Sequence, residues 1–132
     1  PFFCDYGVHI AIGRGVFVNY NCVFLDSNRI TIGADTLIGP GVQIYTATHP
    51  LSAHERIRPR DADGSERTYY VTRAEPVTIG EKAWIGGGAM IMPGVTVGDN
   101  TTIGAGSIVT KSVPPGCFAA GTPCTVVRHL DA

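Results

Sequence analysis

Aliphatic residues recur at every sixth position along most of this chain. From Val77 onward the repeat is unbroken, and its repeating positions are Ile79, Ile85, Ile91, Val97, Ile103 and Val109. The first half has the same repeat in two sets that are separated by two extra residues: Ile12, Val18 and Phe24, then Ile32, Ile38 and Ile44. An amphipathic α-helix needs a repeat near 3.6 residues, so this pattern excludes helices over these stretches.

A period of six fits short strands that are interrupted by corners. The aliphatic residue points inward, and a glycine follows it in four hexads (Gly80, Gly86, Gly98, Gly104), where we expect it to relieve backbone strain at the corner. Four residues after the aliphatic, a small residue suits the narrow part of a triangular coil (Ala83, Ala89, Val95, Thr101, Ser107). One coil cannot bury its own face, so several must stack. The hexads predict four coils, at roughly 12–31, 32–49, 79–96 and 97–114.

The repeat stops at His49 and Pro50 and returns at Val77. We therefore expect one β-helix domain over residues 1–132, with a polar loop excursion at 50–76 and a tail at 114–132 that leaves the coil and packs back over it. The excursion is either a solvated loop or a functional lid. His49 ends a rigid coil, which can hold an imidazole in one orientation. Because histidine titrates close to neutral pH, His49 is a candidate general base.

Composition and net charge restrict the kinds of binding partner that the chain can have. The formal net charge of −1 gives no electrostatic attraction to nucleic acid or to an anionic membrane, and no apolar run is long enough to span a bilayer. The four cysteines (Cys4, Cys22, Cys117, Cys124) form no C-x-x-C pair. We therefore expect reduced thiols in a cytoplasmic protein, with Cys22 in a small-residue packing position.

The segment IGEKAWIGGGAMIMPGVTVGDNTTIGAGSIVTK and the tail that follows it resemble the hexapeptide-repeat acyltransferases. PFFCDYG, VNYNCVFLD and IYTATHPL are similar to the sugar O-acetyltransferases of the maltose, galactoside and nodulation-factor group. The resemblance implies an all-β fold, a left-handed parallel β-helix. It also implies acetyl-CoA as co-substrate, no metal, and a homotrimer with its active sites between subunits.

The resemblance also implies roles for individual residues. His49 matches the family's general base. Five residues match its cofactor surface: Trp84, Ala105, Thr110, Lys111 and Arg128. Gly87, close to Trp84 in the sequence, is a further cofactor-site candidate, because its N–H can donate to an oxyanion. Three match polar positions near its acceptor: Asp5, Asn19 and Asp26. Ser27, which follows Asp26, is a further candidate for the acceptor site.

Each of these roles has a structural alternative. Alternation with inward Ile85 points Trp84 outward, where it covers either a ligand or a subunit interface. The GGG run at Gly87 is either a donor to an oxyanion or a permissive corner. Asp26 is either an acceptor contact or a turn cap. Lys111 and Arg128 are phosphate contacts or ordinary surface residues.

The sequence also departs from the family. Relatives carry a helical segment before PFFCDYG that contributes to the acceptor site, and we expect it to be absent here. The excursion after His49 is longer than in relatives, and Thr125 stands where many have a basic residue.

We therefore expect an acetyl-CoA-dependent acyltransferase that acetylates a hydroxyl of a sugar or a similar small acceptor, without an acyl-enzyme. A xenobiotic acetyltransferase of the same fold is the nearest alternative. A γ-type carbonic anhydrase would need three histidine ligands on zinc, and the four histidines (His9, His49, His54, His129) lack that spacing. A non-catalytic β-helix scaffold is the remaining alternative.

Overall fold

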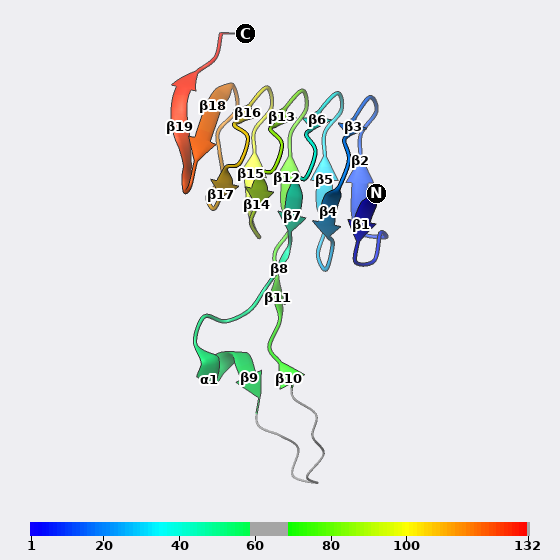
Figure 1. Cartoon of the computed structure of the whole chain (residues 1–132), viewed down its shortest axis with the longest axis vertical. Helices are drawn as coiled ribbons and strands as arrows, with labels where there is room; N and C mark the ends of the chain where they lie inside the picture. The colour runs from blue at the N-terminus through cyan, green and yellow to red at the C-terminus, as the bar shows by residue number, and fades with distance from the viewer. Residues whose placement is uncertain (59–68, 132) are drawn as a thin grey trace.

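The computed structural model describes residues 1–58 and 69–131, and its main body is a stack of triangular coils (Figure 1). Three parallel sheets form the sides of the stack. Sheet A contains, in order, β1 (Phe2–Cys4), β4 (Cys22–Leu25), β7 (Gln43–Tyr45), β14 (Met90–Ile91) and β17 (Ile108–Val109). Sheet B contains β15 (Thr96–Val97), β12 (Val77–Ile79), β5 (Ile30–Ile32) and β2 (Ile10–Ile12). Sheet C runs from β19 (Cys124–His129) and β18 (Cys117–Gly121) through β16 (Thr102–Ile103), β13 (Trp84–Ile85) and β6 (Leu37–Ile38) to β3 (Phe17–Val18).

The predicted β-helix is confirmed. Four complete coils each take one strand from every sheet, and their hexads pair in the expected phase, for example Ile85 with Ile38 and with Ile103. The aliphatic positions of the inner coils are at most 1% exposed. Ile12 differs, at 49% exposed, because β2 is the end strand of sheet B and no further coil of the described chain covers it.

The hexad glycines serve a different purpose from the one predicted. Gly80, Gly86, Gly98 and Gly104 are not the residues with positive φ; a Cβ on Gly86 would lie 2.5 Å from the backbone nitrogen of Ala105 in the next coil. The left-handed corner conformation occurs two residues later, at Lys82, Gly88, Asn100 and Gly106. The glycine after the aliphatic is therefore needed for close stacking of coils, not for an unusual backbone angle.

The small residues four places after each aliphatic are buried, as predicted. Those with hydroxyl groups satisfy them on backbone carbonyls: Thr36 Oγ1 donates to Gly80 at 2.7 Å and Thr101 Oγ1 donates to Pro114 at 2.7 Å. Cys22 is fully buried, which confirms its packing role. All four cysteines are free.

The excursion after the second coil is more ordered than a loop in its described parts. We call residues 47–58 and 69–74 the arm. At its root, β8 (Ala47–Thr48) pairs antiparallel with β11 (Arg73–Ala74). Beyond the root come the short helix α1 (Ala53–Arg56) and the antiparallel pair β9 (Ile57–Arg58) and β10 (Tyr69–Tyr70). The arm projects away from the coils (Figure 1), and the RPRDADGSERT portion of the predicted excursion lies mostly outside the described residues.

The tail does not simply leave the coil. β18 continues sheet C in parallel with β16, and only β19 turns back, antiparallel to β18. The only helix in the described part of the chain, α1, has four residues and is too short to cross a membrane.

Candidate active site

His49 lies at the root of the arm with an exposed side chain. Its Nδ1 atom is 2.9 Å from the carbonyl oxygen of Val71. A carbonyl oxygen only accepts, so Nδ1 must carry the proton and donate it. The neutral imidazole then has its lone pair on Nε2, which is the arrangement that a general base needs.

The peptide groups around Val71 connect His49 to the far side of the arm. The Val71 N–H donates to the carbonyl of Arg56 at 2.7 Å, while the Val71 carbonyl accepts from His49. Arg56 closes the intervening turn through Nη1, which donates to the carbonyls of Pro50 and Leu51 at 3.2 Å and 3.0 Å. The sequence predicts that the rigid coil holds the imidazole. In the structure, a hydrogen-bonded turn of the arm also orients it.

The arm is also fastened to the coil beneath it. Asn28 Nδ2 donates to the carbonyl of Ala74 in β11 at 3.1 Å, and the Asn28 N–H donates to Thr46 Oγ1 at 2.9 Å. Thr46 is fully buried and donates in turn to the carbonyl of Leu25 at 2.7 Å. Asn28 and Thr46 are supports that sequence reasoning missed, because their partners are backbone groups distant in sequence.

Most of the predicted site residues lie at one of the two ends of the sheet A strands, whereas Trp84 in β13 and Arg128 in β19 belong to sheet C. At the carboxyl ends, which we call the arm edge, lie Asp5 after β1, Asp26 and Ser27 after β4, His49 after β7 and β8, and Thr110 and Lys111 after β17. At the amino ends, which we call the glycine edge, lie Asn19 before β4, Gly87 before β14 and Ala105 before β17. The single chain therefore does not bring His49 together with Gly87.

The glycine edge presents unused backbone donors. Gly41, Gly88 and Gly106 stack there with φ near 70°, and their N–H groups donate to the preceding coil. Within the described residues, the N–H groups of Gly87 and Ala105 have no acceptor. Gly87 is half-buried and Ala105 is exposed. Two free N–H donors on adjacent coils can bind carbonyl or anionic oxygens of an extended ligand.

Trp84 points outward, as predicted, and its side chain is 55% exposed. It pairs in register with Leu37 and Thr102, and Leu37 pairs with Phe17. Leu37 and Phe17 are 50% and 58% exposed. Sheet C thus carries an apolar outer surface beside the glycine edge, which fits either alternative for Trp84.

Asp26 is fully buried, and its carboxylate is occupied by the chain itself. Oδ1 accepts the N–H groups of Asp5 and Tyr6 at 3.2 Å and 2.8 Å, and Oδ2 accepts that of His9 at 3.1 Å. Burial alone would raise the pKa of Asp26, but these backbone donors outweigh burial and hold it below its ordinary value. The geometry supports the turn-capping alternative for Asp26 over direct acceptor contact.

The remaining predicted residues have free polar groups at the surface. Asn19 Oδ1 accepts the N–H of Tyr20 at 2.8 Å, and its amide nitrogen has no partner among the described residues. Thr110, Lys111 and Arg128 are exposed, with Arg128 on β19 opposite Phe118. Ser27 is half-buried and Asp5 is exposed.

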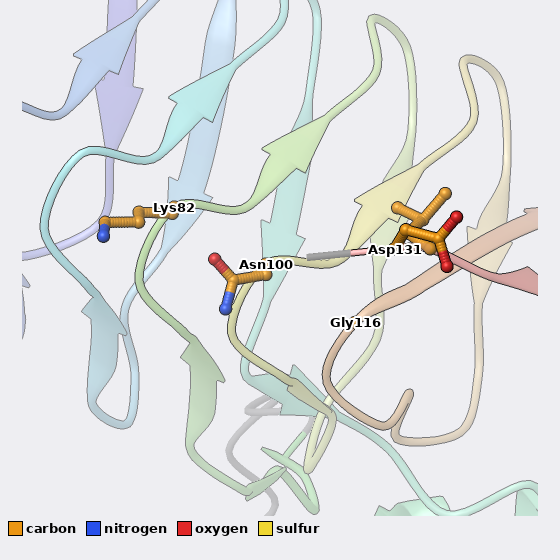
Figure 2. Close-up of a pocket in the computed structure, with 5 residues that line it drawn as sticks. Lys82, Asn100, Gly116 and Asp131 are labelled. Carbon is orange, nitrogen blue, oxygen red and sulfur yellow. The ribbon is translucent and has the colours of Figure 1, made fainter.

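A surface cavity of about 400 Å³ lies elsewhere (Figure 2). Lys82, Asn100 and Gly116 from successive corners between sheets B and C line it, together with Leu130 and Asp131. None of the predicted site residues belongs to it. In the described part of the chain, no group of three or more His, Cys, Asp or Glu side chains could hold a metal ion.

Comparison with known proteins adds to this geometry. The sequence model of the family described as bacterial transferase hexapeptide (six repeats) matches residues 76–111. Nodulation protein L of Rhizobium meliloti is 52% identical over 126 residues, which make up 96% of this chain and 63% of that protein.

Solved structures that resemble this chain are acetyltransferases too. A maltose O-acetyltransferase from Clostridium difficile is 45% identical with a TM-score of 0.87, covering 100% of this chain and 65% of that one. A hexapeptide-repeat-containing acetyltransferase from Vibrio cholerae is 39% identical with a TM-score of 0.87, covering 100% of this chain and 69% of that one. The Vibrio protein is also known in complex with acetyl coenzyme A. The chain thus spans a little under two thirds of nodulation protein L and of the Clostridium enzyme.

Proposed function

Because the chain belongs to the hexapeptide-repeat acetyltransferases, with the left-handed parallel β-helix of that family, we propose that it transfers an acetyl group from acetyl-CoA to a hydroxyl of a sugar or sugar-like acceptor. The observation that carries the proposal is the fixed tautomer of His49, whose Nδ1 donates to Val71 and whose Nε2 is left as a base.

His49 performs the proton transfer in this mechanism. Its Nε2 accepts the proton of the acceptor hydroxyl as the hydroxyl oxygen attacks the thioester carbonyl. When the carbon–sulfur bond breaks, His49 returns that proton to the departing thiolate. Nδ1 stays bound to the Val71 carbonyl throughout, so the imidazolium formed midway is stabilised by an acceptor already in place.

The free N–H groups of the glycine edge supply the complementary part. Gly87 N–H donates to the carbonyl oxygen on which negative charge develops, and Ala105 N–H binds an amide oxygen of the pantetheine arm. Trp84 covers that arm with its ring. Thr110, Lys111 and Arg128 contact the nucleotide end, where the two cations pair with phosphates.

The two edges must come from different subunits, because one chain separates them by the length of the sheet A strands. A homotrimer with three sites between neighbours brings the arm edge of one subunit against the glycine edge of the next. It also covers the apolar surface of Phe17, Leu37 and Trp84. Asp5, Asn19 and Ser27 then face the acceptor, and Asp26 holds the segment that carries Asp5. We place the protein in the cytoplasm, where its four free cysteines stay reduced.

The experiment has two parts. Acetyl-CoA at about 100 times its Kd should stabilise the folded protein by about 2.7 kcal/mol, whereas zinc should not. Trp84→Ala should weaken the shift with acetyl-CoA. Thiol release should then depend on an added acceptor, with maltose and methyl galactoside as first probes. A protein that shows neither a melting shift nor acceptor-dependent thiol release is not an acetyl-CoA-dependent transferase.

A further inference from the structure

Tyr70 lies beside the proposed base with most of its side chain in solvent. Its ring centroid is 6.5 Å from that of His49, with an angle of 60° between the ring planes. The side chain is 60% exposed, so its contact with His49 leaves much of the ring uncovered. The uncovered part of the Tyr70 ring is therefore available to a ligand that approaches His49.

The backbone around Tyr70 is held from two sides. Tyr70 pairs with Ile57 in the antiparallel β9–β10 ribbon. The next residue, Val71, donates to Arg56 and accepts from His49 at 2.7 Å and 2.9 Å. The hydrogen bond that orients the imidazole therefore also holds the backbone of Tyr70 in place, because Val71 directly follows Tyr70.

We infer that Tyr70 is an acceptor-binding residue, whose ring packs against the apolar face of the acceptor while His49 removes the proton from its hydroxyl. This inference rests on the proposed transferase function. A sugar ring has a C–H face beside its hydroxyl groups, and a flat aromatic ring combines a large apolar surface with little conformational freedom. Ile57, on the paired strand and 44% exposed, extends the apolar surface.

We expect the apolar surface of Tyr70 and Ile57 to favour some acceptors over others. An acceptor with an aromatic or otherwise apolar group next to the reacting ring gains more from Tyr70 than a fully hydroxylated one. We therefore expect phenyl galactoside to have a lower KM than methyl galactoside, and the difference to depend on Tyr70.

The test compares Tyr70→Ala, Tyr70→Phe and the parent by thiol release with maltose, methyl galactoside and phenyl galactoside. Tyr70→Ala should raise the acceptor KM by about 3- to 10-fold, with kcat within about twofold of the parent. Tyr70→Phe keeps the ring and should retain the parental KM. Leu51→Ala is the matched control, because Leu51 lies on the same arm and is 97% exposed.

Four results would overturn the inference. If Tyr70→Ala keeps the parental KM for every acceptor that the parent acetylates, the Tyr70 ring does not contact the acceptor. A fall in kcat at unchanged KM makes Tyr70 a positioning residue for His49. Loss of the trimer in Tyr70→Ala, measured by sedimentation, assigns the ring to a subunit contact. If the parent itself acetylates none of the three acceptors, the sugar acceptor class fails, and the role of Tyr70 fails with it.

Discussion

Val71 and His49 are 22 positions apart, and the carbonyl oxygen of Val71 accepts a hydrogen bond from His49 Nδ1 at 2.9 Å. This contact depends on the antiparallel register at the root of the arm, where Thr48 faces Arg73 and Ala47 faces Ala74. A slip of one residue in that register would turn the carbonyl away from the imidazole. The pairing of β8 with β11 is therefore the structural condition for the proposed base.

Asn28→Ala should loosen this register. The variant loses the bond from Nδ2 to the Ala74 carbonyl, whose net contribution is about 0.5–1.5 kcal/mol. We expect kcat to fall about several-fold. Acetyl-CoA binding should stay at the parental level, since the hydrogen bonds of Asn28 reach none of the proposed cofactor residues. Equal losses in both would contradict an effect through His49. Hydrogen exchange at residues 71–74 would measure the loosening directly.

Asp26→Asn should destabilise the protein by about 1.5–3 kcal/mol at pH 7, because the amide lacks the charge that the three backbone N–H donors stabilise. The pKa of Asp26 is lowered in the folded state, so its contribution is complete above the unfolded pKa, near 4. The contribution is lost as pH falls through the folded value. Denaturant titrations should therefore show the two proteins converging in acid, and a constant difference down to pH 2 would contradict the assignment.

Ile32→Ala and Ile12→Ala test the burial gradient along one sheet. The two residues pair in register, but Ile32 is 1% exposed and Ile12 is 49% exposed. Ile32→Ala should cost about 2–5 kcal/mol, and Ile12→Ala roughly half of that or less. Urea unfolding of both variants measures the difference. Equal costs would mean that another surface covers Ile12 in solution.

Gly86→Ala and Gly106→Ala distinguish two reasons for a glycine at a corner: close stacking of the next coil at Gly86, and a positive φ at Gly106. The new Cβ at position 86 would lie 2.5 Å from Ala105 N, whereas the one at position 106 has nothing within 4 Å and only the cost of its φ of 71°. Gly106→Ala should cost about 1–2 kcal/mol. Gly86→Ala should cost about 3 kcal/mol or more, because backbone must move. The reverse order, measured by thermal unfolding, would restore the strain explanation for the hexad glycines.

The sequence predicted the coils because their determinant is local. Ile85 and Ile103 each follow the same six-residue rule, and stacking them needs no knowledge of distant contacts. The reason for Gly86 was missed because it depends on the backbone of the next coil. The Val71 carbonyl was missed because any residue type supplies a carbonyl, so no side-chain signal marks it.

The same distinction applies to the site. His49 stood out because it ends a periodic segment before a proline. Tyr70 did not stand out, because its position beside His49 depends on the fold of the arm. The arm has no sequence repeat from which that fold could be predicted. Asp26 was assigned two roles, and only the burial of its carboxylate separates them.

His49→Ala, measured by steady-state thiol release, tests the central claim most directly. General-base assistance is worth about 10²–10⁴ in rate, so kcat should fall by that factor. The proposed trimer and acetyl-CoA binding should be unchanged, because the side chain is exposed and fills no core position. His54→Ala, on the exposed helix α1, should keep the parental kcat. If His49→Ala retains more than about a tenth of the parental kcat, His49 is not the base.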